Sequence, residues 1–305
     1  MPNPKISLYF LGTDSFAVTV LQRLVDDDQF EILGVITPPD RKVGRKQEVQ
    51  SCAVKKEAVE NGLKVEHDLE VLKGKEMDFL VVVSYGYFLD DEVLQLPKYA
   101  SLNVHASLLP KYRGASPVAS AVLNGDEVTG VSVMQMVKKM DAGPVYAVSE
   151  VAILEHDTEP VLRERLADVG AELLAQVVPG IATGNAEAQE QDEKGISYAP
   201  LIKKQDGLID WENETAIEIE RKLRAYTPWP GIYTNFEGKR LKILKGRVKS
   251  GDVIKPGKVR KDGDDVVVEA KDGLFVLEEI QLDGKRALPV DEFIRGQASF
   301  VGVVF

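Results

Sequence analysis

The first part of the chain alternates between apolar runs of strand length and stretches with helical periodicity. Strands are expected at residues 6–11, 30–36, 64–67, 78–84, 101–105, 130–136 and 145–153, and helices at 52–61, 115–123 and 159–178. One further helix, between the first two strands, is expected to be capped by Ser15. A strand, a helix and a strand in this order favour parallel pairing with a right-handed crossover. The pattern therefore predicts an α/β domain built on a mostly parallel, Rossmann-like sheet.

The pattern changes after a polar stretch at residues 186–194. Thr215 and Glu218 have the spacing of a capping box, and the helix that they begin carries Ile219 and Leu223 on one face. From residue 232 onward, short alternating runs separated by Gly and Asp are typical of a small antiparallel barrel of the OB type. We therefore predict an α/β domain at residues 1–188, a linker at 189–204 and a C-terminal barrel domain at 205–305.

Composition limits the class of protein. The chain has 305 residues, 44% hydrophobic and 29% charged, which is ordinary for a globular protein with room for two domains. No apolar run approaches the length of a membrane span, and the first residues do not resemble a signal peptide. The single cysteine, Cys52, excludes an intramolecular disulfide, and His67, His105 and His156 lack metal-ligand spacing. We expect a cytoplasmic protein with no metal site and no membrane partner.

The charge is uneven along the chain. A net charge of −11 argues against a nucleic-acid partner. Residues 239–261, however, contain ten cations against the single acid Asp252, and the loop at 40–50 is also rich in Arg and Lys. These stretches have two interpretations, because they can keep surface loops soluble or form a surface that follows a nucleic-acid backbone.

Two polar side chains stand out at the end of a predicted strand. Asn103 and His105 alternate with apolar neighbours, so they project from the same face, and Pro110 and Gly114 indicate that the strand ends just before them. A carboxamide and an imidazole at a strand end of an α/β pattern suit a binding cleft. A single histidine in such a place is more often structural, and an aspartate close before a glycine, such as Asp141, is often a turn residue.

The run from Asn103 to Pro117, Asn-Val-His-Ala-Ser-Leu-Leu-Pro-Lys-Tyr-Arg-Gly-Ala-Ser-Pro, resembles the signature of folate-dependent formyltransferases. A later stretch, Met134-Gln135-Met136 through Met140-Asp141-Ala142-Gly143, is similar to the other half of the family site, and the similarity extends along nearly the whole chain. The chain departs from the family at Asp14-Ser15, where Pro-Asp is more frequent, and at Ala106, where Gly is frequent.

The resemblance implies a reaction and assigns residues to it. It implies transfer of the formyl group of 10-formyltetrahydrofolate to the amino group of methionyl initiator tRNA, with no metal needed. We expect a monomer, although the sequence itself does not reveal the oligomeric state. Acyl transfer builds negative charge on the carbonyl oxygen and moves protons between nitrogens. Asn103 is assigned to that oxyanion. His105, acting as a cation, would donate to the same oxygen or protonate the leaving nitrogen, and Asp141 would favour the cation and shuttle protons.

The resemblance also implies binding residues. The folate would be held by Gly86, Tyr87, Leu89, Ser107, Leu108, Leu109, Pro110 and Asp141. The tRNA would contact Arg45, Lys242, Lys245 and Arg247, and Phe16 would pack against the methionine side chain. On the residues alone, the aromatic cluster around Tyr87 and the ring of Phe16 can equally be core packing.

Other functions fit parts of the sequence. A sugar N-formyltransferase or a formyltetrahydrofolate-hydrolysing domain would keep the chemistry, but Ile209-Asp210-Trp211 and Pro228-Trp229-Pro230 are similar to the second domain of the tRNA enzymes. A non-catalytic RNA-binding module would use the same platform and basic barrel. A Ser-His-Asp hydrolase would need Ser107, which lies two residues from His105 without a nucleophile-elbow motif.

Overall fold

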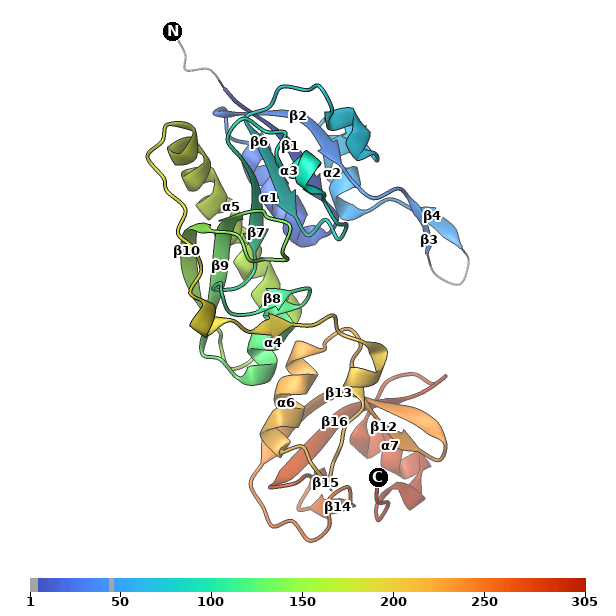
Figure 1. Ribbon diagram of the computed structural model, residues 1–305. Helices are drawn as coiled ribbons and strands as arrows, with labels where there is room; N and C mark the ends of the chain where they lie inside the picture. The colour runs from blue at the N-terminus through green and yellow to red at the C-terminus, as the bar shows by residue number, and fades with distance from the viewer. Residues whose placement is uncertain (1–4, 44–46) are drawn as a thin grey trace. The chain divides into compact units, whose positions relative to one another are not determined.

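The structure is a computed structural model that describes residues 5–43 and 47–305, and these residues form two compact units (Figure 1). The described residues of 1–117, 128–152 and 161–199 make up the first unit, and those of 118–127, 153–160 and 200–305 make up the second. Each unit therefore draws on separate stretches of the chain. The domain boundaries expected near residues 188 and 204 stay a prediction.

The first unit is built on a seven-stranded sheet with the order β10-β9-β7-β6-β1-β2-β5. All neighbours pair in parallel except β9, which is antiparallel to both β7 and β10, so the predicted mostly parallel sheet is confirmed. The strands are β1 (Ile6–Gly12), β2 (Phe30–Ile36), β5 (Val65–Glu66), β6 (Phe79–Val83), β7 (Ala100–His105), β9 (Val128–Gln135) and β10 (Val145–Ala152).

Helices cover one face of this sheet. α1 (Ser15–Val25) and α5 (Glu159–Ala182) lie on it, and Gly170 of α5 packs so closely on Val104 of β7 that a Cβ on this glycine would lie only 2.8 Å from a methyl group of the valine. The expected cap of α1 was wrong by one residue. Asp14 has extended backbone and its carboxylate accepts the Ala17 N–H at 3.2 Å, so Asp14 is the N-cap and Ser15 is the first helical residue.

The other face packs a separate apolar cluster. Tyr9 and Leu11 of β1, Leu80 and Val82 of β6, and Leu89 after β6 belong to it. Short elements complete the unit: α2 (Ala53–Glu60), the 3-10 helices η1 (Leu69–Leu72) and η2 (Glu193–Gly195), α3 (Asp91–Leu94), the hairpin strands β3 (Arg41–Val43) and β4 (Glu48–Gln50), and the pair β8 (Arg113–Gly114) and β11 (Tyr198–Ala199). Both faces of β1 and β6 are therefore buried, which explains their unbroken apolar sequences.

The second unit contains an antiparallel sheet, as predicted, with the order β12-β13-β16-β15-β14 and β17 beside β16. The capping box of Thr215 and Glu218 is present at the start of its helix α6. Trp211, Phe236 and Phe300 are among its buried aromatic residues. Its elements are α4 (Pro117–Asn124), η3 (Lys204–Gly207), α6 (Ala216–Ala225), β12 (Ile232–Phe236), β13 (Lys239–Lys249), β14 (Val259–Asp262), β15 (Asp265–Glu269), β16 (Leu274–Leu282), β17 (Leu288–Pro289), α7 (Val290–Gly296) and η4 (Ala298–Phe300).

Candidate active site

The predicted polar pair lies on β7, in the interior of the first sheet. β7 pairs with β6 on one side and with β9 on the other, and Asn103 is level with Val82 and Met134. Because Asn103 and His105 are two residues apart on one strand, they share a face of the sheet. His105 is the last residue of the strand and is only 6% exposed. The sheet thus holds both side chains at the strand end where ligands of α/β proteins commonly bind.

The two ring nitrogens of His105 have different partners. Nε2 lies 3.0 Å from the backbone carbonyl oxygen of Tyr112, and Nδ1 lies 3.8 Å from Oδ2 of Asp141. A carbonyl oxygen can only accept, so Nε2 must carry hydrogen and donate to it. In the neutral ring, Nδ1 then carries a lone pair that faces the Asp141 carboxylate. In the cation, Nδ1 carries hydrogen and can donate it to that carboxylate. Nδ1 is therefore the nitrogen that can exchange a proton with Asp141 or with a group between them.

Asp141 is brought to the histidine by the loop that joins β9 and β10. Its backbone is left-handed, with φ 48°, and its Oδ2 accepts the N–H of Gly114 at 2.8 Å. The same oxygen faces His105, so the backbone of β8 fixes the carboxylate on one side of the ring. The resemblance implies that these two side chains act together, and the structure places Oδ2 of Asp141 3.8 Å from Nδ1 of His105, where a single water beside the pair can contact both.

A residue that the sequence did not single out holds this loop. The side-chain amide of Gln191 donates to the carbonyl oxygens of Asp141 at 2.9 Å and Gly143 at 2.7 Å. Its carbonyl oxygen accepts from Nε and Nη2 of Arg113, at 3.0 and 2.7 Å. Arg113 is only 4% exposed, so Gln191 provides the acceptor for a buried cation and, at the same time, holds the backbone of the Asp141 loop. Gln191 lies in the stretch predicted to be a linker, at residues 189–204, and no local pattern in the sequence marks it.

The Asn103 carboxamide, unlike its neighbours, has hydrogen-bonding groups that the described residues leave free. It is half-buried, and none of the described residues forms a hydrogen bond with its side chain. Ser107, in contrast, is fully buried and donates its hydroxyl to the carbonyl oxygen of Lys111 at 2.6 Å. The Ser107 hydroxyl is therefore not presented to His105, which leaves the hydrolase interpretation without support.

The segments expected to bind folate occupy two loops of the first unit. Ser132 of β9 fixes the segment after His105, because its hydroxyl donates to the Ser107 carbonyl oxygen at 2.7 Å and accepts from the Leu109 N–H at 3.0 Å. Leu108, Leu109 and Pro110 are partly exposed. In the other loop, Gly86 has a left-handed backbone and Tyr87 is 45% exposed, while Leu89 is buried in the core. Their contacts with folate stay a prediction.

Phe16, expected to contact methionine, is 3% exposed. Its ring packs close to Gly170, and the Arg163 guanidinium lies 5.5 Å from the ring centre. Arg163 also forms an ion pair with Asp14 of the preceding turn. The structure thus places Phe16 in the core of the first unit, and its role in a methionine pocket stays a prediction.

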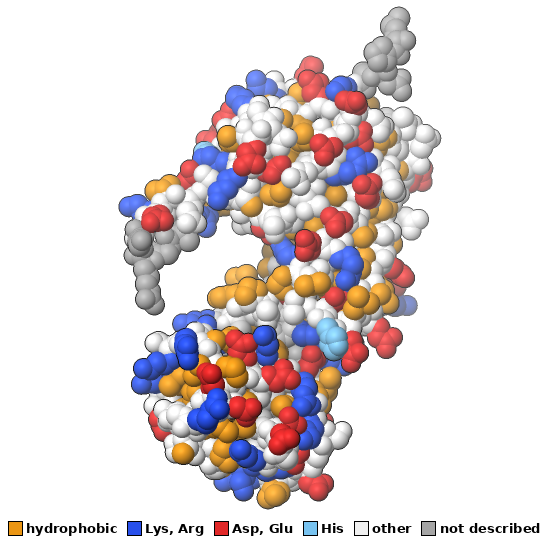
Figure 2. Space-filling view, turned by 180° about the vertical axis from the view of Figure 1, so that it is seen from behind, with side chains coloured by type: hydrophobic (Ala, Val, Ile, Leu, Met, Phe, Trp, Pro, Cys, Tyr) orange, Lys and Arg blue, Asp and Glu red, His pale blue; other side chains and the backbone are white. Residues whose placement is uncertain are grey.

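The cations expected to contact tRNA differ in their surroundings. Arg45 lies outside the described residues. Lys245 forms an ion pair with Glu279 at 2.9 Å, and Arg247 with Asp265 at 2.9 Å and Glu278 at 3.3 Å. Within the described part of the chain, Lys242 has no such partner. Figure 2 shows the same mixture of basic and acidic side chains on the face of the second unit that it presents.

The described residues contain no group of three or more His, Cys, Asp or Glu side chains arranged to hold a metal ion. Among them, no helix combines the length and the apolar character needed to cross a bilayer.

Comparison with known proteins gives consistent results. Residues 5–178 match the family model described as formyl transferase, and residues 201–298 match the formyl transferase C-terminal domain. A methionyl-tRNA formyltransferase from Dehalococcoides mccartyi is 40% identical over an alignment that covers 98% of this chain and 97% of the relative. One from Roseiflexus castenholzii is 39% identical, with 95% and 96% covered.

Solved structures share the fold at lower identity. The N-formyltransferase of Helicobacter canadensis, in complex with folinic acid and dTDP-3-aminofucose, has a TM-score of 0.68 at 21% identity, covering 89% of this chain and 98% of that one. HypX from Aquifex aeolicus, in complex with tetrahydrofolic acid, has a TM-score of 0.63 at 18% identity, covering 97% and 48%. From both domain matches and from relatives near 40% identity over almost its full length, the chain belongs to the formyl transferase family, together with the methionyl-tRNA formyltransferases.

Proposed function

We propose that this chain transfers the formyl group of 10-formyltetrahydrofolate to the amino group of methionyl initiator tRNA, in the cytoplasm and as a monomer. The family membership supports formyl transfer, and the names of the relatives support the charged tRNA as acceptor. Folate ligands in structures of the same fold support a folate-type donor.

The observation that carries the proposal is the pairing of a constrained imidazole with a carboxylate beside an uncommitted carboxamide. The Tyr112 carbonyl occupies Nε2 of His105, and Asp141 faces Nδ1 at 3.8 Å. That distance is too long for a direct hydrogen bond, but a small movement of either side chain would close it, and a group lying beside the pair could contact both atoms. Asn103, on the same strand, adds N–H donors that no described residue occupies.

These groups match the demands of formyl transfer. The neutral amine of the methionyl ester attacks the formyl carbon, a C–N bond forms, and the carbonyl electron pair moves to oxygen. The Asn103 amide donates to that oxyanion. The amine proton passes to the pair formed by His105 Nδ1 and Asp141. As the bond from the formyl carbon to N10 breaks, the pair returns one proton to N10, so one proton moves in total from the attacking nitrogen to the leaving nitrogen.

The test is a formylation assay with charged initiator tRNA and 10-formyltetrahydrofolate, run against a nucleotide-linked amino sugar as rival acceptor. We expect the wild-type protein to formylate only the tRNA. His105→Ala should lower kcat by about 10²- to 10⁴-fold, the usual contribution of a positioned acid-base group, with little change in tRNA affinity.

His156→Ala is the matched control, because His156 is an exposed histidine outside the first unit. Faster formylation of the sugar than of the tRNA would refute the proposed acceptor. Unchanged turnover in His105→Ala would remove the imidazole from the mechanism while leaving the acceptor assignment intact.

A further inference from the structure

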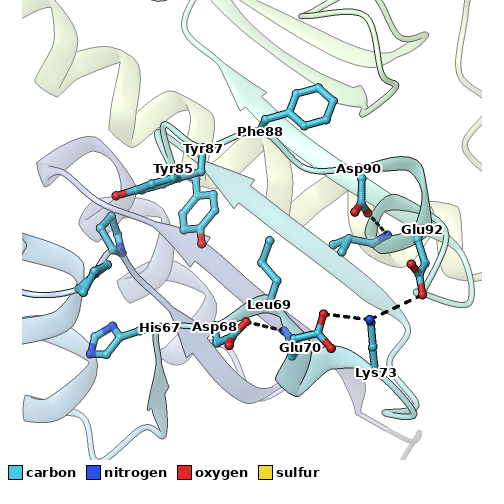
Figure 3. A pocket seen from close by; sticks show the side chains of 13 residues that line it. His67, Asp68, Leu69, Glu70, Lys73, Tyr85, Tyr87, Phe88, Asp90 and Glu92 are labelled. Atoms are coloured by element: carbon cyan, nitrogen blue, oxygen red, sulfur yellow. Dashed lines mark hydrogen bonds and ion pairs between the residues drawn. The ribbon is translucent and has the colours of Figure 1, made fainter.

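A cavity of about 360 Å³ lies in the first unit, apart from the three candidate catalytic side chains (Figure 3). It is formed where β2, β5 and β6 end, by Pro38 and Pro39 after β2, His67 after β5 and Tyr85 after β6. Asn103, His105 and Asp141 do not line it, and neither does any residue of the 107–110 segment. Its volume is at the lower end of the range of small-molecule sites, which suits one flat ring system.

Part of the cavity wall is flat and apolar. The rings of Tyr85 and Tyr87 lie 5.4 Å apart between their centres, inclined by 50°. Figure 3 shows Leu69 on the opposite wall, pointing toward these rings. A planar heterocycle entering this gap would stack on a tyrosine ring on one side and contact Leu69 and the prolines on the other.

Two polar groups of the cavity have positions that no described donor occupies. Tyr85 is only 6% exposed, yet no described residue forms a hydrogen bond with its hydroxyl. Oδ1 of Asp68 accepts the Glu70 N–H at 3.0 Å, and no described donor reaches Oδ2. Burial raises the pKa of Tyr85, so its hydroxyl keeps its proton and can donate or accept. Glu70 is satisfied by Lys73 at 2.9 Å. Asp68 is exposed, so water can occupy its Oδ2, and a ligand that brings an N–H donor can take the place of that water.

Lys73 lines the cavity but is engaged by Glu70 at 2.9 Å, and a second cation, Arg41, lies beside the cavity. Arg41, at the start of the β3–β4 hairpin, donates to the Tyr87 hydroxyl, and its guanidinium lies 5.8 Å from the centre of that ring. Asp68, Asp90 and Glu92 make the lining itself acidic. A phosphate or a glutamate tail would be repelled from the interior, whereas a base could enter with its backbone phosphate left outside near Arg41.

We propose that this cavity binds one unpaired, amino-bearing nucleobase of the single-stranded acceptor end of tRNA. The inference rests on the proposed function and adds a subsite to it. The acceptor end closes with the sequence CCA, and both cytosine and adenine carry an exocyclic amine, which a carboxylate accepts readily. In this position Asp68 receives the amine, Tyr85 supplies the neighbouring hydrogen bond and the Tyr87 ring stacks on the base. The folate contact that the resemblance implies for Tyr87 would then be made by its backbone.

The test measures binding of an uncharged RNA hairpin that ends in single-stranded CCA, so its readout does not depend on formyl transfer. The bases of the single-stranded end are changed one at a time, cytosine to uracil and adenine to hypoxanthine, which replaces the amine by a carbonyl oxygen. At one position, and only there, we expect the wild-type protein to lose about tenfold in affinity, as for the loss of one good base-edge contact.

Asp68→Asn gives the decisive comparison. Asparagine can still accept the Glu70 N–H and can also donate to a carbonyl oxygen, so the variant should fold and should reverse the preference, binding the oxo-substituted base about as well as the wild type binds the amine. The exposed Asp28 provides the matched control, and Asp28→Asn should keep the wild-type preference.

The outcomes separate cleanly. Reversal by Asp68→Asn at one base supports the subsite. Three results would overturn it. The first is failure of the wild type to bind the RNA, and the second is simple addition of the affinity losses caused by Asp68→Asn and by the base change. The third is an effect of Asp68→Asn that takes the form of a higher KM for the folate donor. If the hairpin shows the reversal but charged tRNA is not formylated, the proposed function fails and the subsite stands as an RNA site.

Discussion

Replacing Gln191 by alanine is expected to slow formyl transfer although Gln191 reaches none of the candidate catalytic side chains directly. Its amide holds the backbone of Asp141 and Gly143 at 2.9 and 2.7 Å, and its carbonyl oxygen receives two hydrogen bonds from Arg113. Without this clamp the Asp141 loop can drift, and the carboxylate no longer stays opposite Nδ1 of His105. Because a misplacement of about 1 Å can cost about 100-fold in rate, we expect kcat to fall by about 10- to 100-fold.

The structure also sets the size of the stability change. Hydrogen bonds to a charged partner contribute about 1.5–3 kcal/mol, and those between neutral groups about 1 kcal/mol each. Gln191 is half-buried, so water can replace part of what Gln191→Ala removes. We therefore expect the free energy of unfolding to fall by about 2–3 kcal/mol, measured by urea denaturation.

A second variant separates the two duties of this side chain. Gln191→Glu keeps acceptors for Arg113 but loses both donors to the Asp141 loop and places negative charge against two carbonyl oxygens. It should therefore unfold closer to wild type than Gln191→Ala, yet show an equal or larger loss of kcat. Gln189→Ala is the matched control, because Gln189 is exposed and pairs with Val145 through its backbone alone. Wild-type kcat in Gln191→Glu would refute the clamp, as would an equal loss in Gln189→Ala.

Two further predictions concern the second unit. Lys242→Ala should reduce the slope of log affinity for tRNA against log salt concentration by about 1. Lys245→Ala should change this slope less, because Glu279 already neutralises the Lys245 ammonium. Equal slopes for the two variants in a filter-binding titration would contradict this. Hydrogen bonds from the backbone N–H and hydroxyl of Thr215 lower the pKa of Glu218 below 4.5 in the folded protein. The Glu218 carboxylate therefore stabilises the folded state fully above about pH 4.5, and this stabilisation is lost as the pH falls through the pKa that Glu218 has in the folded protein. Urea unfolding at pH 7 and pH 3 should therefore show a smaller pH effect in Glu218→Gln than in wild type, by less than about 1 kcal/mol.

The sequence predicted the parts of the site that depend on local patterns. Period-two alternation placed Asn103 and His105 on one face of a strand, and the strand is observed where it was expected. The capping box at Thr215 is another local signal that the structure confirms. Where two neighbouring residues compete, as Asp14 and Ser15 do for the cap of α1, the choice depends on backbone angles that a pattern does not contain.

Contacts between distant segments were beyond the reach of such patterns. Gln191 is 50 residues from Asp141 and 78 from Arg113, and its own neighbours in sequence are polar and ordinary. In the sequence, the basic stretch of the second unit looks like a row of unpaired cations, because the acids that pair with Lys245 and Arg247 lie on other strands. Charge counted along a strand therefore overstates the charge that a partner would meet.

A backbone carbonyl determines which nitrogen of His105 faces Asp141, and that carbonyl is itself held by a distant segment of the chain. Tyr112 has φ 60°, a left-handed conformation that costs a residue other than glycine about 1–3 kcal/mol. Ser197, 85 residues away, accepts the Tyr112 N–H at 2.9 Å, and β11 pairs with β8 directly after it. These contacts offset the cost and aim the Tyr112 oxygen at Nε2 of His105. The segment that returns to β8 thus decides which imidazole nitrogen faces Asp141, although it contributes no side chain to the chemistry.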